Sequence, residues 1–468
     1  MGIQHWSTIA APVSEVFDWH ARPGALQRLM APWMPGRVRR EAESLADGRA
    51  ELALPGGQLW VAKHDPAGFV PGRAFVDERV DAGLSTAALG ALRWRHEHRF
   101  DPVAGSPAEG GDAGAEGGAA QGARADATRM HDIVDTPMGS QILRPMFVYR
   151  HRQLADDLAR HRELAAAPMT VAITGGGGLV GTALSAFLST GGHRVIRLVR
   201  RDAEAGERRW DPAAPASDLL DRVDAVVHLA GATIFGRFDG EHRHRIRASR
   251  IGPTRRLAEL AAASGVRAFV SASAIGWYGS DRGEASLAET SGSGSGFLAE
   301  VVDDWEAEAR VAAERGVRSV QVRTGLVLSP RGGMLQVLRP IYQAGLGGPL
   351  AGGTHWQSWI DLDDLVDIYA RALVDERLEG PVNAVVPEAV RQEEFAAELA
   401  AVLHRPAMLR TPSLGPRVLL GQQGMHELAL ANQKVVPGKL AALSHRFRRP
   451  RLEDALRHQL GRQREAGR

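Results

Sequence analysis

The segment that decides the fold is Met169-Thr170-Val171-Ala172-Ile173-Thr174-Gly175-Gly176-Gly177-Gly178-Leu179-Val180-Gly181. A short apolar run leads into the glycines, and apolar residues then recur at helical spacing over residues 182–193. Strand, glycine turn and helix in this order predict a dinucleotide site, because the turn is tight and the backbone must approach a pyrophosphate. The start of the helix would offer free N–H groups to the phosphates. A glycine-rich turn without a ligand is the alternative.

The residues after the next strand indicate which dinucleotide is bound. That strand is expected at 194–199, and Arg200 and Arg201 follow it. An NAD-binding site usually has an acid here, about 20 residues past the glycines. A carboxylate would repel a 2′-phosphate, whereas a guanidinium pairs with it in bidentate fashion. We therefore expect NADP(H), with Arg200 the better candidate, against the alternative of surface arginines at a strand end.

Strands and helices continue to alternate along the rest of this region. Further apolar strands, separated by helical patterns, are expected at 224–232, 268–273, 319–323 and 382–386. Such alternation is typical of an α/β fold in which a parallel sheet is wound on both faces by helices, as in Rossmann-type domains.

Residues 1–165 show a different order of elements. A strand at 3–9 precedes short helices near 12–17 and 23–30, strands at 50–54, 59–64, 74–80 and 92–100, and a long helix at 138–166. This order is that of the α+β helix-grip fold. Residues 101–127 consist almost entirely of Gly, Ala and small polar or acidic residues, so they cannot bury enough surface to order themselves. We predict a disordered loop inside this domain rather than a linker between two domains.

The segment VSEVFDWHARPGALQRLMAPW, residues 13–33, resembles the SRPBCC proteins, the START and Bet v 1-like superfamily. The resemblance covers residues 1 to about 165. It implies that a curved sheet and the long helix enclose an apolar cavity for a lipid or polyketide-like ligand. The alternative is a packed domain without a cavity that serves as a partner surface.

A second resemblance covers about 169–460. Its motifs are TGGGGLVG, HLAGA, SASAIGWYG, DDWEAEA, VRTGLVLSPRGGML, GGPLAGGTHWQSWIDLDDL and GPVNAVVPEAVRQEEFA. In this order they are similar to the atypical extended short-chain dehydrogenases named the epimerase family. The resemblance implies an NADP-binding domain at 169–406 and a small C-terminal domain at 407–468. One departure is Asp361, which stands where a His is expected.

The same resemblance assigns the cofactor site residue by residue. The pyrophosphate would lie against the glycine turn, the adenosine ribose against the end of the next central strand, and the nicotinamide near a third strand end. In chain order the implied residues are Thr174, Gly175, Gly178, Leu179, Val180 and Gly181, then Leu229 and Ala230 with Arg250 nearby, and then Arg323, Thr324 and Gly325.

The residues at the catalytic positions differ from those of ordinary short-chain dehydrogenases, which use a Tyr hydroxyl and a Lys one helical turn later. Ser273 matches their substrate-holding Ser, but Phe297 and Val301 stand where the Tyr and Lys belong. No lysine occurs between His64 and Gln433, so no shift of the alignment restores the pair. Tyr278 is the first candidate for proton transfer and Glu300 the second. A packed aromatic ring and a solvated Glu are the alternatives.

Composition limits the remaining possibilities. The chain has no cysteine, which excludes disulfides and thiolate metal sites and fits a cytoplasmic protein; no metal site is predicted. No apolar run of membrane-spanning length and no secretory signal is recognised. The net charge of +2 indicates no polyanionic partner, and the basic segment 403–468 is interpreted as a solvated face rather than a nucleic-acid contact.

Two functional hypotheses follow. The first is an NADP(H)-dependent oxidoreductase or epimerase-like enzyme that acts on a small apolar or polyketide-like molecule. The second is a non-catalytic NADP(H)-binding protein that reports the state of the cofactor through its N-terminal domain. A purely structural partner protein is disfavoured by the glycine turn and Arg200. The substrate and the oligomeric state are left open.

Overall fold

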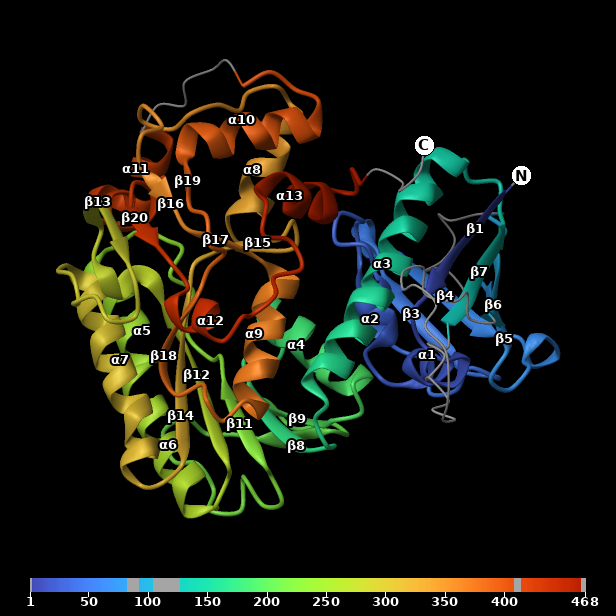
Figure 1. The fold of residues 1–468 in the computed structure, drawn as a ribbon, viewed down its shortest axis with the longest axis horizontal. Coiled ribbons are helices and arrows are strands. Elements are labelled where there is room, and N and C mark those ends of the chain that lie inside the picture. The colour runs from blue at the N-terminus through green and yellow to red at the C-terminus, as the bar shows by residue number, and fades with distance from the viewer. Residues whose placement is uncertain (1, 82–91, 104–126, 408–413, 464–468) are drawn as a thin grey trace, which may run out of the picture. The chain divides into compact units, whose positions relative to one another are not determined.

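The computed structural model of the chain describes residues 2–81, 92–103, 127–407 and 414–463 (Figure 1). The chain divides into two compact units, with the boundary at Ala165 and Ala166. Each unit has its own hydrophobic core, so each is described by itself. Within the described ranges, none of the helices combines the length and apolarity that a membrane span requires.

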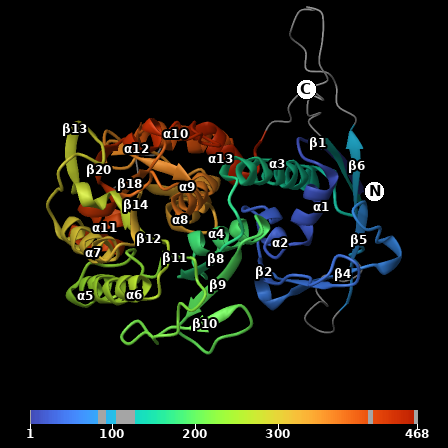
Figure 2. The ribbon, with the colours of Figure 1, turned by 60° about the horizontal axis from the view of Figure 1, so that its bottom comes forward.

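The first unit contains a seven-stranded antiparallel sheet in the order β1-β7-β6-β5-β4-β3-β2. Its strands are β1 (Gly2–Ile9), β2 (Arg37–Arg40), β3 (Arg49–Ala53), β4 (Leu59–His64), β5 (Ala74–Arg79), β6 (Arg95–Val103) and β7 (Ala127–Asp135). The helices α1 (Val13–Ala21), α2 (Ala25–Leu29) and α3 (Ser140–Leu164) complete the unit (Figure 2). The strand, helix pair, strand run and long helix occur in the predicted order.

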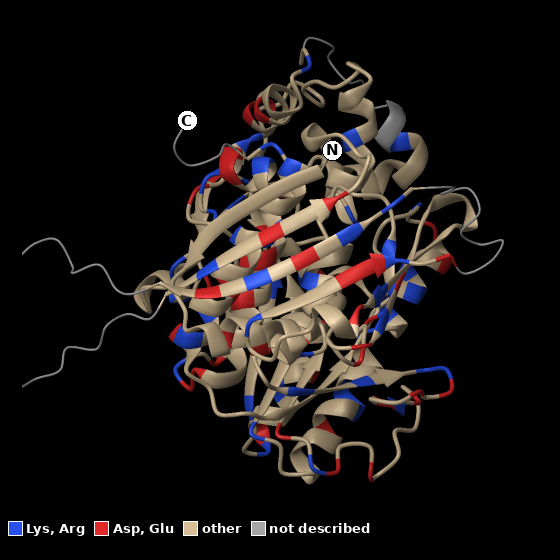
Figure 3. Ribbon diagram, turned by 90° about the vertical axis from the view of Figure 1, so that its right-hand side faces the viewer, with Lys and Arg blue, Asp and Glu red and all other residues tan. Residues whose placement is uncertain are grey.

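One face of this sheet is buried and the other is solvated. In β6, His96, His98 and Phe100 are buried, whereas Glu97 and Arg99 point outward and pair with each other. Figure 3 shows acidic and basic residues in alternation along these strands. This pattern is the one expected of an antiparallel sheet that packs on a core on one side only.

The predicted disordered loop is wrong at both of its ends. Residues 101–103 continue β6 and Ala127 begins β7, and the two strands pair as far as Val103 and Ala127. Residues 104–126 lie outside the described part of the chain. Two strands, β2 and β7, were not predicted. In β7 the buried positions Thr128, Met130, Asp132 and Val134 include two polar residues, so no apolar alternation marks the strand.

The second unit confirms the predicted doubly wound parallel sheet. The seven strands lie in the order β10-β9-β8-β11-β12-β14-β18, and all their pairings are parallel. They are β8 (Thr170–Thr174), β9 (Arg194–Val199), β10 (Glu207–Arg209), β11 (Ala225–His228), β12 (Ala268–Ala274), β14 (Arg318–Thr324) and β18 (Gly380–Ala384). The short strand β10 was not predicted.

Two helix pairs cover the faces of this sheet (Figure 1). The pair α6 (Ile251–Ala263) and α7 (Phe297–Glu314) packs on one face, and the pair α4 (Leu179–Thr190) and α9 (Leu362–Val374) packs on the other. The chain runs from β8 outward to β9 and β10 and then returns to β11 on the other side of β8. Ligands of open α/β sheets bind at such a switch point, beyond the carboxyl ends of the strands.

The C-terminal segment packs against the dinucleotide-binding region within the same compact unit. Its strand β20 (Asn432–Val435) pairs with β13 (Asp281–Leu287), and α13 (Leu452–Leu460) packs on α10 (Gln392–Leu403). The helices α11 (Leu414–Gly424) and α12 (Gly438–Ala442) belong to the same compact unit.

Candidate dinucleotide site

The glycine turn connects β8 to α4 and depends on the absence of side chains. Gly175 has a φ of +68°, and a Cβ atom there would lie 2.8 Å from the carbonyl carbon of Leu229. A Cβ atom on Gly181 would lie 2.3 Å from the carbonyl oxygen of Gly175. Side chains at these two positions would therefore push apart the turn, the first turn of α4 and the segment after β11.

The amino end of α4 is open. Gly178 is its N-cap and no side chain caps it, so the N–H groups of its first turn are available to an anion. Gly177 and Gly178 are exposed, and a Cβ atom on Gly177 would meet nothing within 4 Å. Leu179 and Val180 are half-buried at the start of the helix. The structure thus presents backbone donors and open space where the sequence predicts the pyrophosphate.

Thr174 plays a structural part in this turn. Its side chain is fully buried, and Oγ1 accepts hydrogen bonds from the N–H groups of Leu229 at 3.1 Å and Ala230 at 3.2 Å. Oγ1 also lies 2.7 Å from Nδ1 of His228. The hydroxyl is therefore committed to joining β8 to β11, and only the backbone of Thr174 is left to face a cofactor.

A buried cation lies beside Gly231 and Ala232, which follow Leu229 and Ala230 in the chain. Arg250 is 6% exposed, and its guanidinium donates to the carbonyl oxygens of Ala232 at 3.0 Å and Ile246 at 3.1 Å. Within the described residues no carboxylate pairs with it, and burial lowers its pKa to about 10. A buried cation without an anionic partner is costly. A bound phosphate would compensate this charge, so the site fits the predicted dinucleotide.

The arginines that follow β9 differ in their contacts. Arg201 pairs with Glu207, with an NH1–Oε2 distance of 2.8 Å. Arg200 is exposed and has no hydrogen-bond or ion-pair partner among the described residues. Arg197 on β9 lies against the glycine turn, because a Cβ atom on Gly176 would be 3.2 Å from its side chain. Arg197 was not identified from the sequence. The signal that could have found it is its position between Ile196 and Leu198, which are buried on the opposite face of β9.

The predicted catalytic Ser273 and Tyr278 and the predicted cofactor residue Arg323 meet in one buried network. Arg323 donates to both carboxylate oxygens of Glu306, at 2.7 Å each, and Ser273 donates to the same carboxylate at 2.5 Å. The Tyr278 hydroxyl accepts from Arg323 at 3.2 Å and donates to Asn383 Oδ1 at 2.8 Å. Sequence analysis did not identify Glu306 or Asn383.

This network places Tyr278 poorly for acid–base catalysis. The residue is fully buried, and burial raises the pKa of its hydroxyl. The hydroxyl also lies 3.0 Å from the carbonyl oxygen of Ala288, so its hydrogen-bonding capacity is used within the protein. A general acid must reach the substrate directly or through one water. Tyr278 is therefore positioned as a packed aromatic residue, the alternative considered from the sequence.

We predict that Tyr278→Phe lowers stability without affecting the cofactor. The change leaves Asn383 Oδ1 and an N–H of Arg323 with one partner fewer in a buried environment, which costs about 1–3 kcal/mol. Urea unfolding should show this loss, while titration with NADPH should give an unchanged affinity. Reduced turnover in a variant whose stability is unchanged would restore Tyr278 as a catalytic candidate.

The remaining predicted residues lie apart from this network. Glu300 is exposed in the first turn of α7 and contacts neither Ser273 nor Tyr278 in the described structure. Phe297 and Val301, at the positions of the missing Tyr and Lys, belong to an apolar cluster at the start of the same helix. Thr324 ends β14, and its hydroxyl donates to its own strand at Val322.

Packing explains the glycine at 325 and the acid at 361. A Cβ atom on Gly325 would lie 2.7 Å from the carbonyl oxygen of Ser358, so the close approach of two segments requires glycine there. Asp361 is fully buried, and its side chain accepts from the N–H of Asp363 at 2.9 Å as the N-cap of α9. Gln459 donates to its other oxygen at 2.9 Å. The unexpected Asp361 therefore has a structural role.

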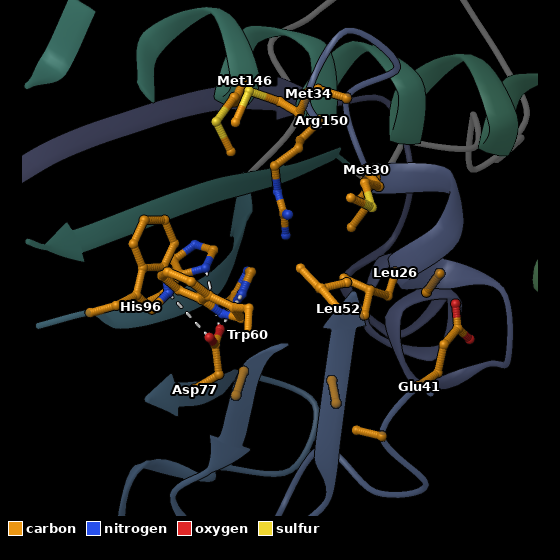
Figure 4. A pocket seen from close by; sticks show the side chains of 18 of the residues that line it. Leu26, Met30, Met34, Glu41, Leu52, Trp60, Asp77, His96, Met146 and Arg150 are labelled. Atoms are coloured by element: carbon orange, nitrogen blue, oxygen red, sulfur yellow. Dashed lines mark hydrogen bonds and ion pairs between the residues drawn. The ribbon is translucent and has the colours of Figure 1, made fainter. Parts of the chain in front are cut away.

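A second site lies inside the first unit, where a cavity of about 400 Å³ opens between the sheet and the helices (Figure 4). Most of its wall is apolar, with Leu26, Met30, Leu52, Trp60 and Met146 among the lining residues. Its volume lies within the range of about 300–1,000 Å³ usual for ligand pockets. The predicted cavity is thus present in this unit.

Polar groups gather at one end of the cavity. Asp77, His96 and His98 line it from the sheet, His20 lines it from α1, and Arg150 reaches into it from α3 (Figure 4). The Nε atom of Arg150 is buried without a hydrogen-bond partner. Glu41 also lines the cavity, on the side away from Asp77 and His96 (Figure 4). The mostly apolar wall therefore contains a cluster of polar groups that the sequence did not predict.

Two family models match the chain. Residues 171–385 match the NAD dependent epimerase/dehydratase family, and residues 411–459 match a domain of unknown function. An epimerase family protein of Mycobacterium bovis is 39% identical over 290 residues, which cover 61% of this chain and 96% of that protein. A chloroplastic epimerase family protein of Arabidopsis thaliana, named as an SDR39U1 homolog, is 35% identical over 62% of this chain and 86% of its own length.

Solved structures show similar folds. A structure titled nucleoside-diphosphate sugar epimerase from Corynebacterium glutamicum has a TM-score of 0.82 and 41% identity, covering 98% of this chain and 90% of its own. The human epimerase family protein SDR39U1, solved with NADPH, has a TM-score of 0.58 and 31% identity over 62% of this chain and 99% of its own. A Thermus thermophilus UDP-glucose 4-epimerase, at 20% identity and a TM-score of 0.51, shares the fold.

Proposed function

Because the chain belongs to the epimerase family, whose mycobacterial member it matches over 96% of that protein's length, we propose that it is an NADP(H)-dependent oxidoreductase or nucleotide-sugar-epimerase-like protein. The family fold is one that binds nicotinamide dinucleotides, and the human relative was solved with NADPH. The choice of NADP(H) over NAD(H) for this chain rests on its own residues.

The observation that carries this choice is the unpaired Arg200. It follows β9 at the position where an NAD site usually has an acid, and its guanidinium has no partner among the described residues. Its neighbour Arg201 is held by Glu207. In this proposal Arg200 binds the 2′-phosphate, the open end of α4 binds the pyrophosphate, and Arg250 balances the phosphate charge from the other side.

We predict that Arg200→Ser weakens NADPH binding about 10- to 100-fold, because a charge-assisted hydrogen bond contributes about 1.5–3 kcal/mol. NADH affinity should change little, since NADH has no 2′-phosphate. Isothermal titration of the full chain measures both values. The matched control is Arg201→Ser, which removes the same charge from the neighbouring residue that Glu207 already holds. An equal loss in both variants would assign the effect to general surface charge.

Bound NADPH would supply a hydride, and the chain must supply the proton. The described residues at the usual Tyr and Lys positions, Phe297 and Val301, can neither give a proton nor lower a pKa. Tyr278 is enclosed in the Glu306–Arg323 network. The proton for the reaction therefore has to come from the substrate, from water or from a group of the enzyme brought to the site when substrate binds.

The lack of a proton donor at the usual Tyr and Lys positions, Phe297 and Val301, favours a second candidate function, a non-catalytic NADP(H)-binding sensor. The two functions differ in turnover. If the chain is an oxidoreductase, NADPH absorbance should fall in steady state with a ketone substrate, at a rate that depends on substrate concentration. If it is an epimerase, the cofactor is regenerated in each cycle, so turnover should appear as interconversion of nucleotide-sugar epimers at constant NADPH absorbance. If it is a sensor, NADPH should bind tightly with neither consumption of NADPH nor interconversion of epimers.

We further propose that the first unit binds an apolar molecule in its cavity. The supporting observations are the volume of about 400 Å³ and the apolar walls. An environment-sensitive apolar dye should gain fluorescence on binding, and a medium-chain fatty acid should displace it. No dye binding to the folded chain would favour the alternative of a partner surface.

A further inference from the structure

Three side chains at the polar end of the cavity form a compact group of nitrogen and oxygen donors. Asp77 lies on β5 directly opposite His96 on β6, and His98 lies two residues further along β6. Successive residues of a strand point to opposite faces, so His96 and His98 share the face that lines the cavity. Both imidazoles are buried, and the Asp77 side chain is 15% exposed. The sheet register therefore fixes this group.

The distances within the group match the edges of a metal coordination polyhedron. Asp77 Oδ2 lies 3.3 Å from His96 Nδ1 and 3.6 Å from His98 Nε2. One donor atom of each of the three residues lies within 4.8 Å of the others. Tetrahedral ligands about 2.1 Å from a zinc ion lie about 3.4 Å from one another. The two measured distances bracket this value.

The far sides of both imidazoles meet a second carboxylate. Asp132 on β7 lies opposite His98, and its Oδ1 is 3.1 Å from His96 Nε2 and 2.8 Å from His98 Nδ1. Its other oxygen is 2.8 Å from His151 Nε2, and Ser7 Oγ contacts the remaining nitrogen of His151 at 2.6 Å. Metal-binding histidines characteristically have such a carboxylate on the ring nitrogen that faces away from the metal.

The charges around the group suit a divalent cation. Asp77 and Asp132 are carboxylates with side chains 15% and 1% exposed, and the described arginines that line the cavity are Arg22 and Arg150. His20 lines the same cavity, and its ring centroid lies 6.0 Å from that of His98. Its Nδ1 contacts the carbonyl oxygen of Val16 at 2.8 Å, and its buried Nε2 has no hydrogen-bond partner.

We propose that Asp77, His96 and His98 form a binding site for a divalent transition metal of the Zn²⁺ type, with a coordination position open to the cavity. Two imidazoles and one carboxylate are a ligand set for zinc and its neighbours in the first transition row. Three protein ligands leave room for water or for an oxygen atom of a molecule in the cavity. No metal site is expected from the sequence, and this site is independent of the dinucleotide site.

The test is zinc titration of the full chain after treatment with a chelator. Isothermal titration with ZnCl₂ should show one tight site per chain, and Asp77→Asn and His98→Gln should each weaken that site at least 100-fold. The matched control is His64→Asn. His64 lines the same cavity, but its Nδ1 contacts the carbonyl oxygen of Ser44, and an Asn amide can preserve that contact. The control should retain the affinity of the wild type.

Equal zinc affinity in wild-type protein and in the folded Asp77→Asn and His98→Gln variants would overturn the proposal, as would the absence of a saturable site in the wild type. If these variants do not fold, the wild type decides. Crystals of the zinc-loaded chain should show an anomalous peak at the zinc edge between Asp77, His96 and His98. A loaded crystal without a peak there would mean that the cluster is a buried hydrogen-bonded network only.

Discussion

Replacing Glu306 with leucine is expected to destabilise the dinucleotide-binding unit by about 3–5 kcal/mol, the usual cost of removing one partner of a buried ion pair. The side chains of Glu306 and Arg323 are 1% and 3% exposed, and two hydrogen bonds of 2.7 Å join them. The variant leaves the Arg323 charge buried, and it also removes the acceptor of Ser273. The measurement is urea unfolding followed by circular dichroism.

Two controls separate this effect from loss of volume. The double variant Glu306→Leu with Arg323→Met removes both charges. It should recover much of the lost stability, because no guanidinium is left buried without a carboxylate partner. Glu308→Gln, on the same helix, breaks the more exposed pair with Arg255 and should cost no more than about 1 kcal/mol. A cost below about 1 kcal/mol for Glu306→Leu would show that the network contributes little.

The second large effect is expected at Gly181. Gly181→Ala should destabilise the unit by about 1–3 kcal/mol or more, because the new Cβ atom would lie 2.3 Å from the carbonyl oxygen of Gly175. The turn must then move away from α4, so NADPH affinity should fall as well. Thermal unfolding and NADPH titration of the same preparation measure both effects.

The neighbouring Gly177 provides the matched control. It has ordinary backbone angles, and a Cβ atom there would meet nothing within 4 Å. Gly177→Ala should therefore leave the unfolding temperature unchanged, although it adds a methyl group at the proposed pyrophosphate site. Equal destabilisation by the two substitutions would mean that the close approach of Gly181 to the turn does not support the fold.

The sequence was sufficient to predict the fold of the second unit, because local signals there agree with the final structure. The strands at 170–174, 194–199 and 268–274 are short apolar runs bounded by turn residues, and the helices between them have one apolar face. Gly175 and Gly181 were also recognisable, since their chemistry depends on a local turn. The short β10, with the sequence Glu-Arg-Arg, carries no such signal.

The buried network around Glu306 could not be read from the sequence. Ser273, Glu306 and Arg323 lie on β12, α7 and β14, and only the packing of α7 against the sheet brings them together. The sequence suggested Ser273 and Tyr278 for catalysis, and the resemblance to the epimerase family implied Arg323 for the cofactor. The structure instead gives these three residues a shared set of hydrogen bonds. A Glu in a helix is ordinarily solvated, so nothing marked Glu306.

The polar end of the cavity was missed for a related reason. His96 and His98 alternate along β6, a pattern that places both on one face of the strand. Their partners Asp77 and Asp132 come from neighbouring strands, and the register that pairs them is a tertiary property. Asp132, together with Thr128, also interrupts the apolar alternation of β7, which is why this strand was not predicted.

The measurement that tests the central proposal most directly is a titration of the full wild-type chain with NADPH and, separately, with NADH. Arg200 at the end of β9 favours the extra phosphate, whereas Arg250 would compensate phosphate charge in either cofactor. We expect NADPH to bind at least about tenfold more tightly, the equivalent of one charge-assisted hydrogen bond at about 1.4 kcal/mol. Equal affinities, or tighter binding of NADH, would contradict the assignment of the chain as an NADP(H)-binding protein.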